Sequence, residues 1–298
     1  FITAQGFANI SMWTVIIGAI ANITLDPIFI FGFKMGVRGA ALATVISQGI
    51  SCVWVICFLT GKKTILRLKK ENLIAAPKLI LPCVALGLST FIMQASESVI
   101  SVCFNSSLLK YGGDIAVGAM TILTSIMQFA MLPLQGIAQG AQPITSYNYG
   151  AGNADRVSKT FRLLLTVCLS YSFLLWGCIM LFPAVFAKIF TSDAELVAFT
   201  AKALRIYCAV LFIFGIQIAC QMTFVSIGNA VCSISVAVLR KFVLLLPLIY
   251  ILPHVIADQT MAVYTAEPCA DIIAVSCTGI LFASRFRKAL KKLREKNA

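Results

Sequence analysis

The sequence has 298 residues, of which 60% are hydrophobic and only 12% are charged, and its mean hydropathy is +0.94. Soluble domains use about 45 to 50% apolar residues, so this composition excludes an ordinary soluble protein and indicates an integral membrane protein. The formal net charge of +13 would also suit a nucleic-acid-binding protein, and the positions of the basic residues decide between the two.

Apolar stretches long enough to cross a hydrocarbon layer of about 30 Å recur along the chain, so the spanning elements should be helices and not barrel strands. The third and fifth exceed a straight crossing, and we expect tilt or interfacial ends there. The chain opens on Phe1 without a charged leader, so we expect a fragment that lacks its N-terminal part. We predict an all-α polytopic protein with eight spans, at 8–33, 36–60, 79–108, 115–140, 160–190, 197–226, 231–252 and 260–284.

The basic residues gather in three segments, 61–78, 156–162 and 285–296, which hold 16 of the 24 Lys and Arg residues. With eight spans, all three segments fall on one face of the membrane, which the positive-inside rule makes cytoplasmic. Such a surface beside anionic lipid accounts for the charge, so we expect a lipid bilayer and no nucleic acid as partner.

The 11 cysteines lie mostly inside the predicted spans and form no CxxC pair. We expect them to be small buried apolar residues, with neither a disulfide framework nor a zinc site.

The charged segment 61–78 is predicted to be a cytoplasmic linker between two lobes. It separates a two-helix part, 1–60, from a six-helix part, 79–284, and a basic cytoplasmic tail follows at 285–298.

An internal echo at an offset of about 222 residues supports this division. Each copy has a glycine followed five residues later by a serine, and a later proline: Gly6, Ser11 and Pro27 in one, Gly228, Ser233 and Pro247 in the other. The first two helices therefore look like counterparts of the last two. A full protein would then have two six-helix lobes, and this chain lacks about four helices of the first.

Asp26 stands in the apolar stretch NITLDPIFIF, where an ionised carboxylate costs about 2.5 to 3.5 kcal/mol. Asn22 lies one turn earlier on the same helix face, and Pro27 frees backbone carbonyls. Counting from the hairpin tip places Thr44 at the same depth on the next span, with Ala40 one turn above it. These oxygens suit a small alkali cation, and the carboxylate could instead carry a proton. The alternative is a hydrogen-bonded aspartate that stabilises a kink.

Glu97 lies near the middle of the third predicted span and has no partner apparent in the sequence. It is either a proton or substrate-cation site, or a protonated, hydrogen-bonded glutamate. Further polar residues within the spans either line a cavity with it or join helices together; they are Gln94, Asn105, Gln128, Gln135 and Gln217.

Glu267 and Asp271 are four residues apart in TAEPCADIIA. The last hairpin is predicted to turn near 256, which places Arg240 level with Asp271. Because a paired charge is far cheaper in lipid than a lone one, we expect a structural ion pair from Arg240, or from Lys241, to Asp271.

Three stretches, PLQGIAQGAQPITSYNYGAGNADRV, NITLDPIFIFGFKMGVRGAALATVISQ and SIGNAVCSISVAVLRKFVLLLPLIYILP with AEPCAD, together resemble the multidrug and toxic compound extrusion (MATE) family, closest to its bacterial, MepA-like branch. The resemblance implies helices five to twelve of a twelve-helix, two-lobe transporter. It also implies a cation- or proton-binding set of Asn22, Asp26, the Ala40 carbonyl and Thr44.

The resemblance leaves parts of the family pattern unmatched. The partner carboxylate on helix one lies outside this chain. Another branch has a functional glutamate that matches Glu97, but its helix-ten aspartate has no counterpart, and Ser89 replaces a frequent proline.

The resemblance implies a secondary active transporter. We expect a monomer that exports small organic, often cationic, compounds by antiport with Na⁺ or H⁺ and needs no cofactor or metal beyond that coupling ion. The alternative is a lipid-linked saccharide flippase of the same fold superfamily. A membrane enzyme is disfavoured because the only histidine, His254, excludes an HExxH zinc site.

Overall fold

A computed structural model describes residues 2–61, 64 and 77–295 and, within this part of the chain, contains helices and no strands. The chain divides into two compact units, Phe1–Pro77 (unit 1) and Lys78–Ala298 (unit 2), each of which is described by itself. Most of the predicted linker, at 62–63 and 65–76, lies outside the described residues.

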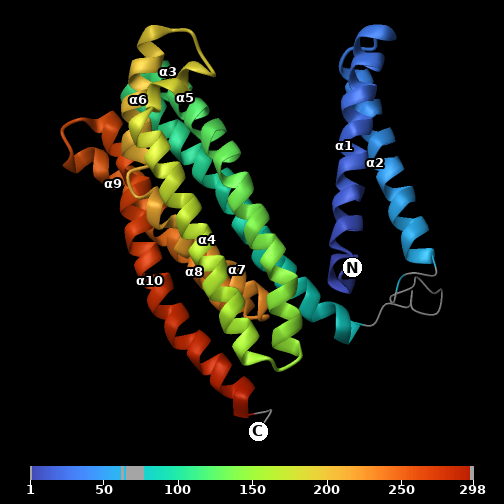
Figure 1. Cartoon of the computed structure of the whole chain (residues 1–298). Helices are drawn as coiled ribbons and strands as arrows, with labels where there is room; N and C mark the ends of the chain where they lie inside the picture. The colour runs from blue at the N-terminus through green and yellow to red at the C-terminus, as the bar shows by residue number, and fades with distance from the viewer. Residues whose placement is uncertain (1, 62–63, 65–76, 296–298) are drawn as a thin grey trace. The chain divides into compact units, whose positions relative to one another are not determined.

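Unit 1 is a helical hairpin of α1 (Ala8–Pro27) and α2 (Val37–Thr60), preceded by a short 3₁₀ turn at Thr3–Gln5 (Figure 1). The α-helix ends at Pro27 and continues as a π-helix, η2 (Ile28–Gly32). Proline lacks a backbone N–H, and wider turns are a common consequence beside it. Serine and threonine join the two helices, because Ser51 Oγ donates to the Thr14 carbonyl over 3.1 Å.

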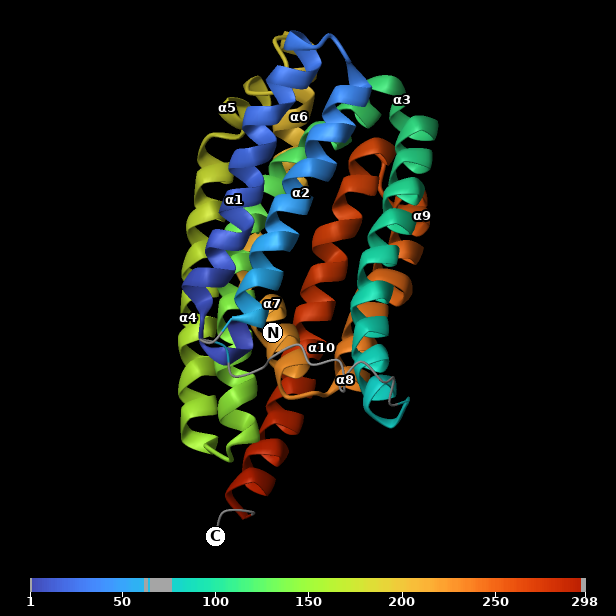
Figure 2. The same ribbon diagram turned by 90° about the vertical axis from the view of Figure 1, so that its right-hand side faces the viewer.

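Unit 2 is built from the rest of the described chain. Its elements are α3 (Pro77–Gly150), α4 (Ala154–Leu181), α5 (Pro183–Lys188), α6 (Ala194–Tyr207), η4 (Leu211–Ile213), α7 (Phe214–Ser226), α8 (Ala230–Val238), the π-helix η5 (Leu239–Leu245), α9 (Leu246–Val255) and α10 (Gln259–Glu295). Figure 2 shows α9 beside α10, which extends past it toward the C-terminus.

The 74-residue helix α3 is broken at Gly113, where φ is 65° and ψ is −159°. The chain before the break and the chain after it run in opposite directions (Figure 1). Hydroxyl groups from α10 donate to carbonyls on both sides of the break: Thr260 to Tyr111 over 2.9 Å, and Tyr264 to Ala116 over 2.7 Å. The turn is thus stabilised by side-chain hydroxyl groups, which donate hydrogen bonds to backbone carbonyls beside the break.

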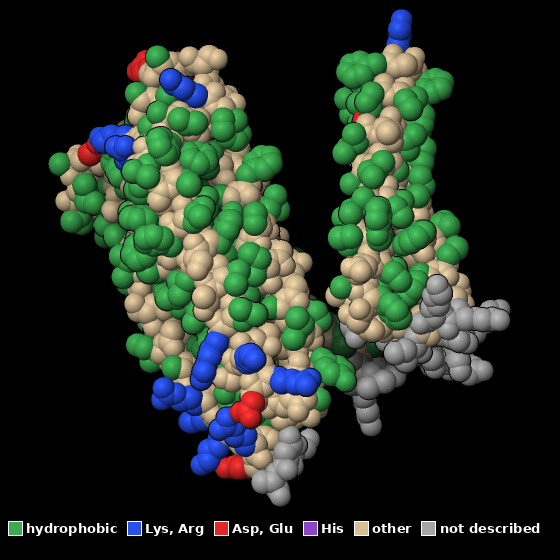
Figure 3. Space-filling model, in the orientation of Figure 1, with side chains coloured by type: hydrophobic (Ala, Val, Ile, Leu, Met, Phe, Trp, Pro, Cys, Tyr) green, Lys and Arg blue, Asp and Glu red, His purple; other side chains and the backbone are tan. Residues whose placement is uncertain are grey.

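The core of unit 2 lies where α3, α6, α9 and α10 meet. Its largest fully buried side chains include Phe104, Leu108, Leu204, Ile249 and Tyr264. Hydrophobic side chains are spread over the visible outer face, and most of the visible Lys and Arg side chains lie toward one end of the unit (Figure 3). An apolar outside around a packed core is the arrangement of a protein whose solvent is lipid.

Close packing of α4 and α7 depends on Gly215. A Cβ atom there would lie 2.6 Å from the Cys168 carbonyl oxygen and 2.9 Å from the Leu169 nitrogen. Glycine therefore lets the two backbones approach, as small residues do between membrane helices.

Six helices among the described residues are long and apolar enough to cross a membrane, or seven if the bent pair of α6 with η4 and α7, which meet at 47°, is one span. One of the six, Gln94–Gly150, has 57 residues, about 85 Å of helix. Since it is broken at Gly113, it has length for two crossings. A multi-pass helical membrane protein is therefore established, and the count of eight spans stays a prediction.

Three predicted spans are less regular than expected. The segment 160–190 is two helices, because Pro183 starts α5 after a break at Phe182. The segment 197–226 bends after Tyr207, and 231–252 is split into α8, η5 and α9. Hydropathy does not reveal these irregularities, because they change the path of the helix and not the polarity of the sequence.

All 11 cysteines are free, and, contrary to the prediction from composition, they are not all buried. Four are buried, and five are exposed on the surface of the helices: Cys52, Cys57, Cys83, Cys178 and Cys277. An apolar side chain on a lipid-facing surface needs no burial in protein, so the composition did not distinguish the two places.

Candidate coupling and substrate sites

The predicted coupling site lies between α1 and α2. Asn22 Nδ2 donates to Thr44 Oγ1 over 3.5 Å, a long contact, and Thr44 Oγ1 donates to the Ala40 carbonyl over 2.9 Å. The structure therefore brings together the amide, the hydroxyl and the carbonyl that counting along the helices placed level with one another.

Asp26 lies one turn from Asn22 on α1, and its side chain is half-buried. Its Oδ1 is shielded from solvent and has no hydrogen-bond partner among the described residues. The structure shows no hydrogen bond from Asp26 to Asn22 or Thr44 within that part of the chain. A shielded carboxylate oxygen without a partner is costly, and a proton or a small cation would satisfy it.

The residues of this site offer one carboxylate, one amide, one hydroxyl and one carbonyl, all hard oxygen donors. No group of three or more His, Cys, Asp or Glu that could hold a metal occurs among the described residues. With a single carboxylate, the set suits a monovalent ion or a proton better than a divalent cation.

A second polar site lies inside unit 2. Arg240 forms ion pairs with two carboxylates of α10: Nε with Asp271 Oδ1 at 2.6 Å, and Nη2 with Glu267 Oε1 at 2.7 Å. The guanidinium carbon also lies 4.7 Å from the centre of the Phe214 ring, a cation–π contact. The expected pair of Arg240 with Asp271 is present, and Glu267 joins it.

Lys241 forms an ion pair with Glu97 of α3, with Nζ 3.0 Å from Oε1. Glu97 thus has a partner, which the sequence did not reveal. We call the five residues Glu97, Arg240, Lys241, Glu267 and Asp271 the charge cluster. Four of its side chains are 8 to 12% exposed, whereas that of Glu97 is 58% exposed, so Glu97 is the exposed member of the cluster.

The remaining predicted site residues are scattered in their exposure. Gln217 is buried with an unpartnered Oε1, Asn105 is half-buried, and Gln94 and Gln128 are exposed. Among the described residues no hydrogen bond joins any of them to Glu97. A common cavity for these residues stays a prediction.

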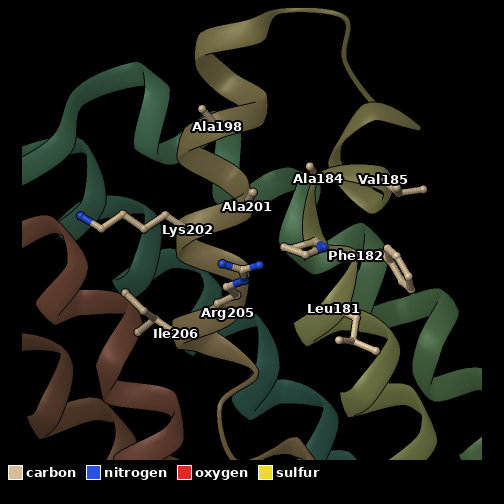
Figure 4. A pocket seen from close by; sticks show the side chains of 10 residues that line it. Leu181, Phe182, Ala184, Val185, Ala198, Ala201, Lys202, Arg205 and Ile206 are labelled. Atoms are coloured by element: carbon tan, nitrogen blue, oxygen red, sulfur yellow. The ribbon is translucent and has the colours of Figure 1, made fainter.

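A cavity of about 620 Å³ lies in unit 2 where α4, α5 and α6 come together, and none of its lining residues belongs to the charge cluster. Figure 4 shows its two basic side chains, Lys202 and Arg205, both from α6, and its apolar wall with Leu181 and Phe182. Lys202 also pairs with Asp258 at 3.3 Å. None of the predicted site residues lines this cavity.

The sequence model of the MatE family matches residues 89–251, more than half of the chain. The multidrug export protein MepA of Staphylococcus saprophyticus is 24% identical over 98% of this chain and 64% of its own length. MepA of Staphylococcus aureus is 26% identical over 72% of this chain and 48% of its own.

Solved structures agree with the sequence relatives. The MATE multidrug transporter DinF-BH in complex with R6G is 34% identical, with a TM-score of 0.82, over 92% of this chain and 61% of that one. A MATE protein in a bent conformation has the same fold, with a TM-score of 0.90 at 23% identity, over 97% of this chain and 64% of that one. The chain thus spans less than two thirds of the length of these proteins.

Proposed function

The chain belongs to the MatE family, whose members are transporters and not enzymes, and from that premise we propose that the intact protein is a secondary active exporter of small organic compounds. It exchanges them for Na⁺ or H⁺ across the bacterial cell membrane. The observation that carries the proposal is the similarity to MepA multidrug export proteins over 98% of the chain. A flippase for lipid-linked saccharides is not favoured by these comparisons.

The coupling ion binds at Asp26, in the set with Asn22, the Ala40 carbonyl and Thr44. Support comes from the contacts that join Asn22, Thr44 and Ala40 and from the shielded, unpartnered Oδ1 of Asp26. Coupling requires that the ion and the exported compound favour different conformations, because a ligand with equal affinity for both shifts nothing.

One ion per transport cycle supplies enough free energy for the export of a neutral compound. Export of a neutral compound against a hundredfold gradient costs about 2.7 kcal/mol. One cation that enters down 100 mV releases about 2.3 kcal/mol, and a tenfold ion gradient adds about 1.4 kcal/mol. A single site with one carboxylate is therefore sufficient for a neutral compound, whereas a one-for-one exchange with a monovalent organic cation moves no net charge and is driven by the ion gradient alone.

Asp26→Asn tests the coupling site in the intact gene product. The amide keeps the shape of the carboxyl group, but it does not bind a proton and has no negative charge to attract a cation. We therefore expect ion-driven efflux of ethidium and norfloxacin from membrane vesicles to fall to background. Asp258→Asn is the matched control, because Asp258 is half exposed in a pair with Lys202 and should leave efflux unchanged.

Protein amount and melting temperature must be the same in both variants, so that lost efflux is not lost folding. Wild-type efflux and ion dependence in Asp26→Asn would reduce Asp26 to a structural residue at a kink. Imposing a Na⁺ gradient or a pH gradient separately on proteoliposomes decides the coupling ion.

Glu97 is the first contact for a positively charged compound in unit 2. It is the exposed member of the charge cluster, and Gln94, Asn105, Gln128 and Gln217 supply polar groups along the same unit. Glu97→Gln should weaken the export of cationic compounds and spare neutral ones, as competition between labelled substrates will measure.

A further inference from the structure

The charge cluster holds three carboxylates and two cationic groups. Arg240 serves both Glu267 and Asp271, and Lys241 serves Glu97. Because Lys241 is paired with the exposed Glu97, the buried group of Arg240, Glu267 and Asp271 would carry one net negative charge with every group ionised. Uncompensated charge in such surroundings costs several kcal/mol, so a proton or another cation has to neutralise it.

The proton that neutralises this charge is expected on Glu267. Its side chain is 92% buried, Oε1 accepts from Arg240, and Oε2 is shielded from solvent without a hydrogen-bond partner among the described residues. Asp271 and Glu97 are paired with Arg240 and Lys241 at 2.6 and 3.0 Å, and neither of them has a shielded oxygen without a partner among the described residues. A proton on Oε2 removes the net charge at the one oxygen that nothing else satisfies.

Lys241 connects the buried part of the cluster with the exposed part. Its Nζ is paired with Glu97, and it also interacts electrostatically with Glu267. A lysine side chain has four rotatable carbons and a compact charge, so the ammonium group can change partners without movement of η5.

We propose that the charge cluster exchanges one proton for one organic cation: the cation binds Glu97, Lys241 moves to Glu267, and Glu267 releases its proton. This deepens the proposed function, on which it rests, by naming a cationic substrate class and a second protonation site apart from Asp26.

The charges balance at each stage of the exchange. Before binding, two cationic residues face two carboxylates and one carboxylic acid. After binding, Arg240, Lys241 and the organic cation face three carboxylates, and the Oε2–H proton has passed to water. The cluster is neutral in both states, so neither state pays for an unpaired buried charge.

Other ionisable groups surround Glu267 and have to be considered in any pH dependence. They are Glu97 from α3, Tyr207 at the end of α6 and Cys208 directly after it, Arg240 and Lys241 from η5, and Asp271 from α10. Tyrosine and cysteine are neutral in the physiological range, which leaves the carboxylates to exchange the proton.

The test is a proton count on the purified, intact transporter that carries Asp26→Asn, so that no proton comes from that carboxyl. Tetraphenylphosphonium is the probe, because its charge is permanent. In a weakly buffered solution with a pH-indicator dye, we expect about one proton released for each cation bound. Release of one proton also makes the affinity rise about tenfold per pH unit while Glu267 is protonated.

Glu267→Gln, added to the same background, should abolish proton release and remove the pH dependence of binding. Lys241→Met should abolish release as well but bind the cation more tightly, because nothing then competes for Glu97. Glu97→Gln should lose saturable binding.

Binding without proton release in the Asp26→Asn protein overturns the inference, and so does release that persists in Glu267→Gln. The number of protons that the Asp26→Asn protein releases per bound cation tests the inference even if a further variant does not fold. If Asp26→Asn abolishes efflux while the proton count fails, the proposed function stands and only the exchange at Glu267 is lost.

Discussion

Ion pairs of similar length have very different surroundings in this protein. The pair of Arg240 with Asp271 has a length of 2.6 Å, and its side chains are 12 and 11% exposed. The pair of Arg294 with Asp155 has a length of 2.7 Å, but its side chains are 66 and 90% exposed. Removing one partner of a buried pair leaves an uncompensated charge, whereas water takes over at an exposed one. Distance alone therefore does not tell how much a pair stabilises.

Arg240→Met should destabilise the protein by about 3 to 5 kcal/mol, because Glu267 and Asp271 would both lose their cation. Arg294→Met is the control and should cost about 0 to 1 kcal/mol. Melting of the purified variants in the same detergent measures the difference.

Restoring neutrality should recover part of the loss. Arg240→Met combined with Glu267→Gln and Asp271→Asn is expected to melt above the single variant. Equal melting temperatures for Arg240→Met and Arg294→Met would show that the buried pairs contribute no more than the exposed one.

At the level of elements, breaks in the helices shape unit 2. Gly113 divides α3, Pro183 separates α4 from α5, and π-helical turns follow α1 and α8. Each break frees backbone groups, and at Gly113 hydroxyls of Thr260 and Tyr264 bind the carbonyls nearby. Such satisfied irregularity is tolerated at membrane depth only inside protein or beside water.

Gly113→Ala should lower stability by about 1 to 3 kcal/mol, because a φ of 65° with a ψ of −159° is a region that only glycine visits readily. Gly136→Ala is the matched control: it lies in the second part of α3, and a Cβ there meets nothing within 4 Å. It should be neutral or stabilise by up to about 1 kcal/mol.

Thermal melting and the yield of folded protein are the measurements for this pair. A Gly113→Ala protein that melts with the wild type would mean that the turn relaxes to ordinary dihedral angles and that α10 adapts to it.

For the whole molecule, charge predicts orientation. Arg294 near the C-terminus pairs with Asp155 at the start of α4, so two of the three basic segments meet at one end of unit 2, where Figure 3 shows Lys and Arg gathered. Lys202 pairs with Asp258 at the turn before α10, a separate and less charged site. A bilayer between these two groups would place the basic one on the cytoplasmic side.

Reporter fusions test this orientation in bacteria. Alkaline phosphatase joined after Ala298 should be inactive and green fluorescent protein bright, because the basic tail stays in the cytoplasm. Insertion of the phosphatase at Asp258 should give the opposite pattern. An active phosphatase at Ala298 would reverse the assignment of the two faces.

Hydropathy alone was enough to establish a helical, multi-pass membrane protein, and helix geometry alone placed Asn22, Ala40 and Thr44 together and Arg240 beside Asp271. Those predictions depend on properties that are local in the sequence or on counting from one hairpin turn. Both kinds of information survive without knowledge of how distant helices pack.

Tertiary structure decided what lies beyond such counting. Lys241 and Glu97 are 144 residues apart, and their pairing depends on the rotation of η5 and α3 about their axes, which no spacing in either segment specifies. The unpartnered oxygens of Asp26 and Glu267 likewise appear only when every neighbour is in place. Burial and pairing are properties of the packed molecule, since they are set by side chains from several helices at once.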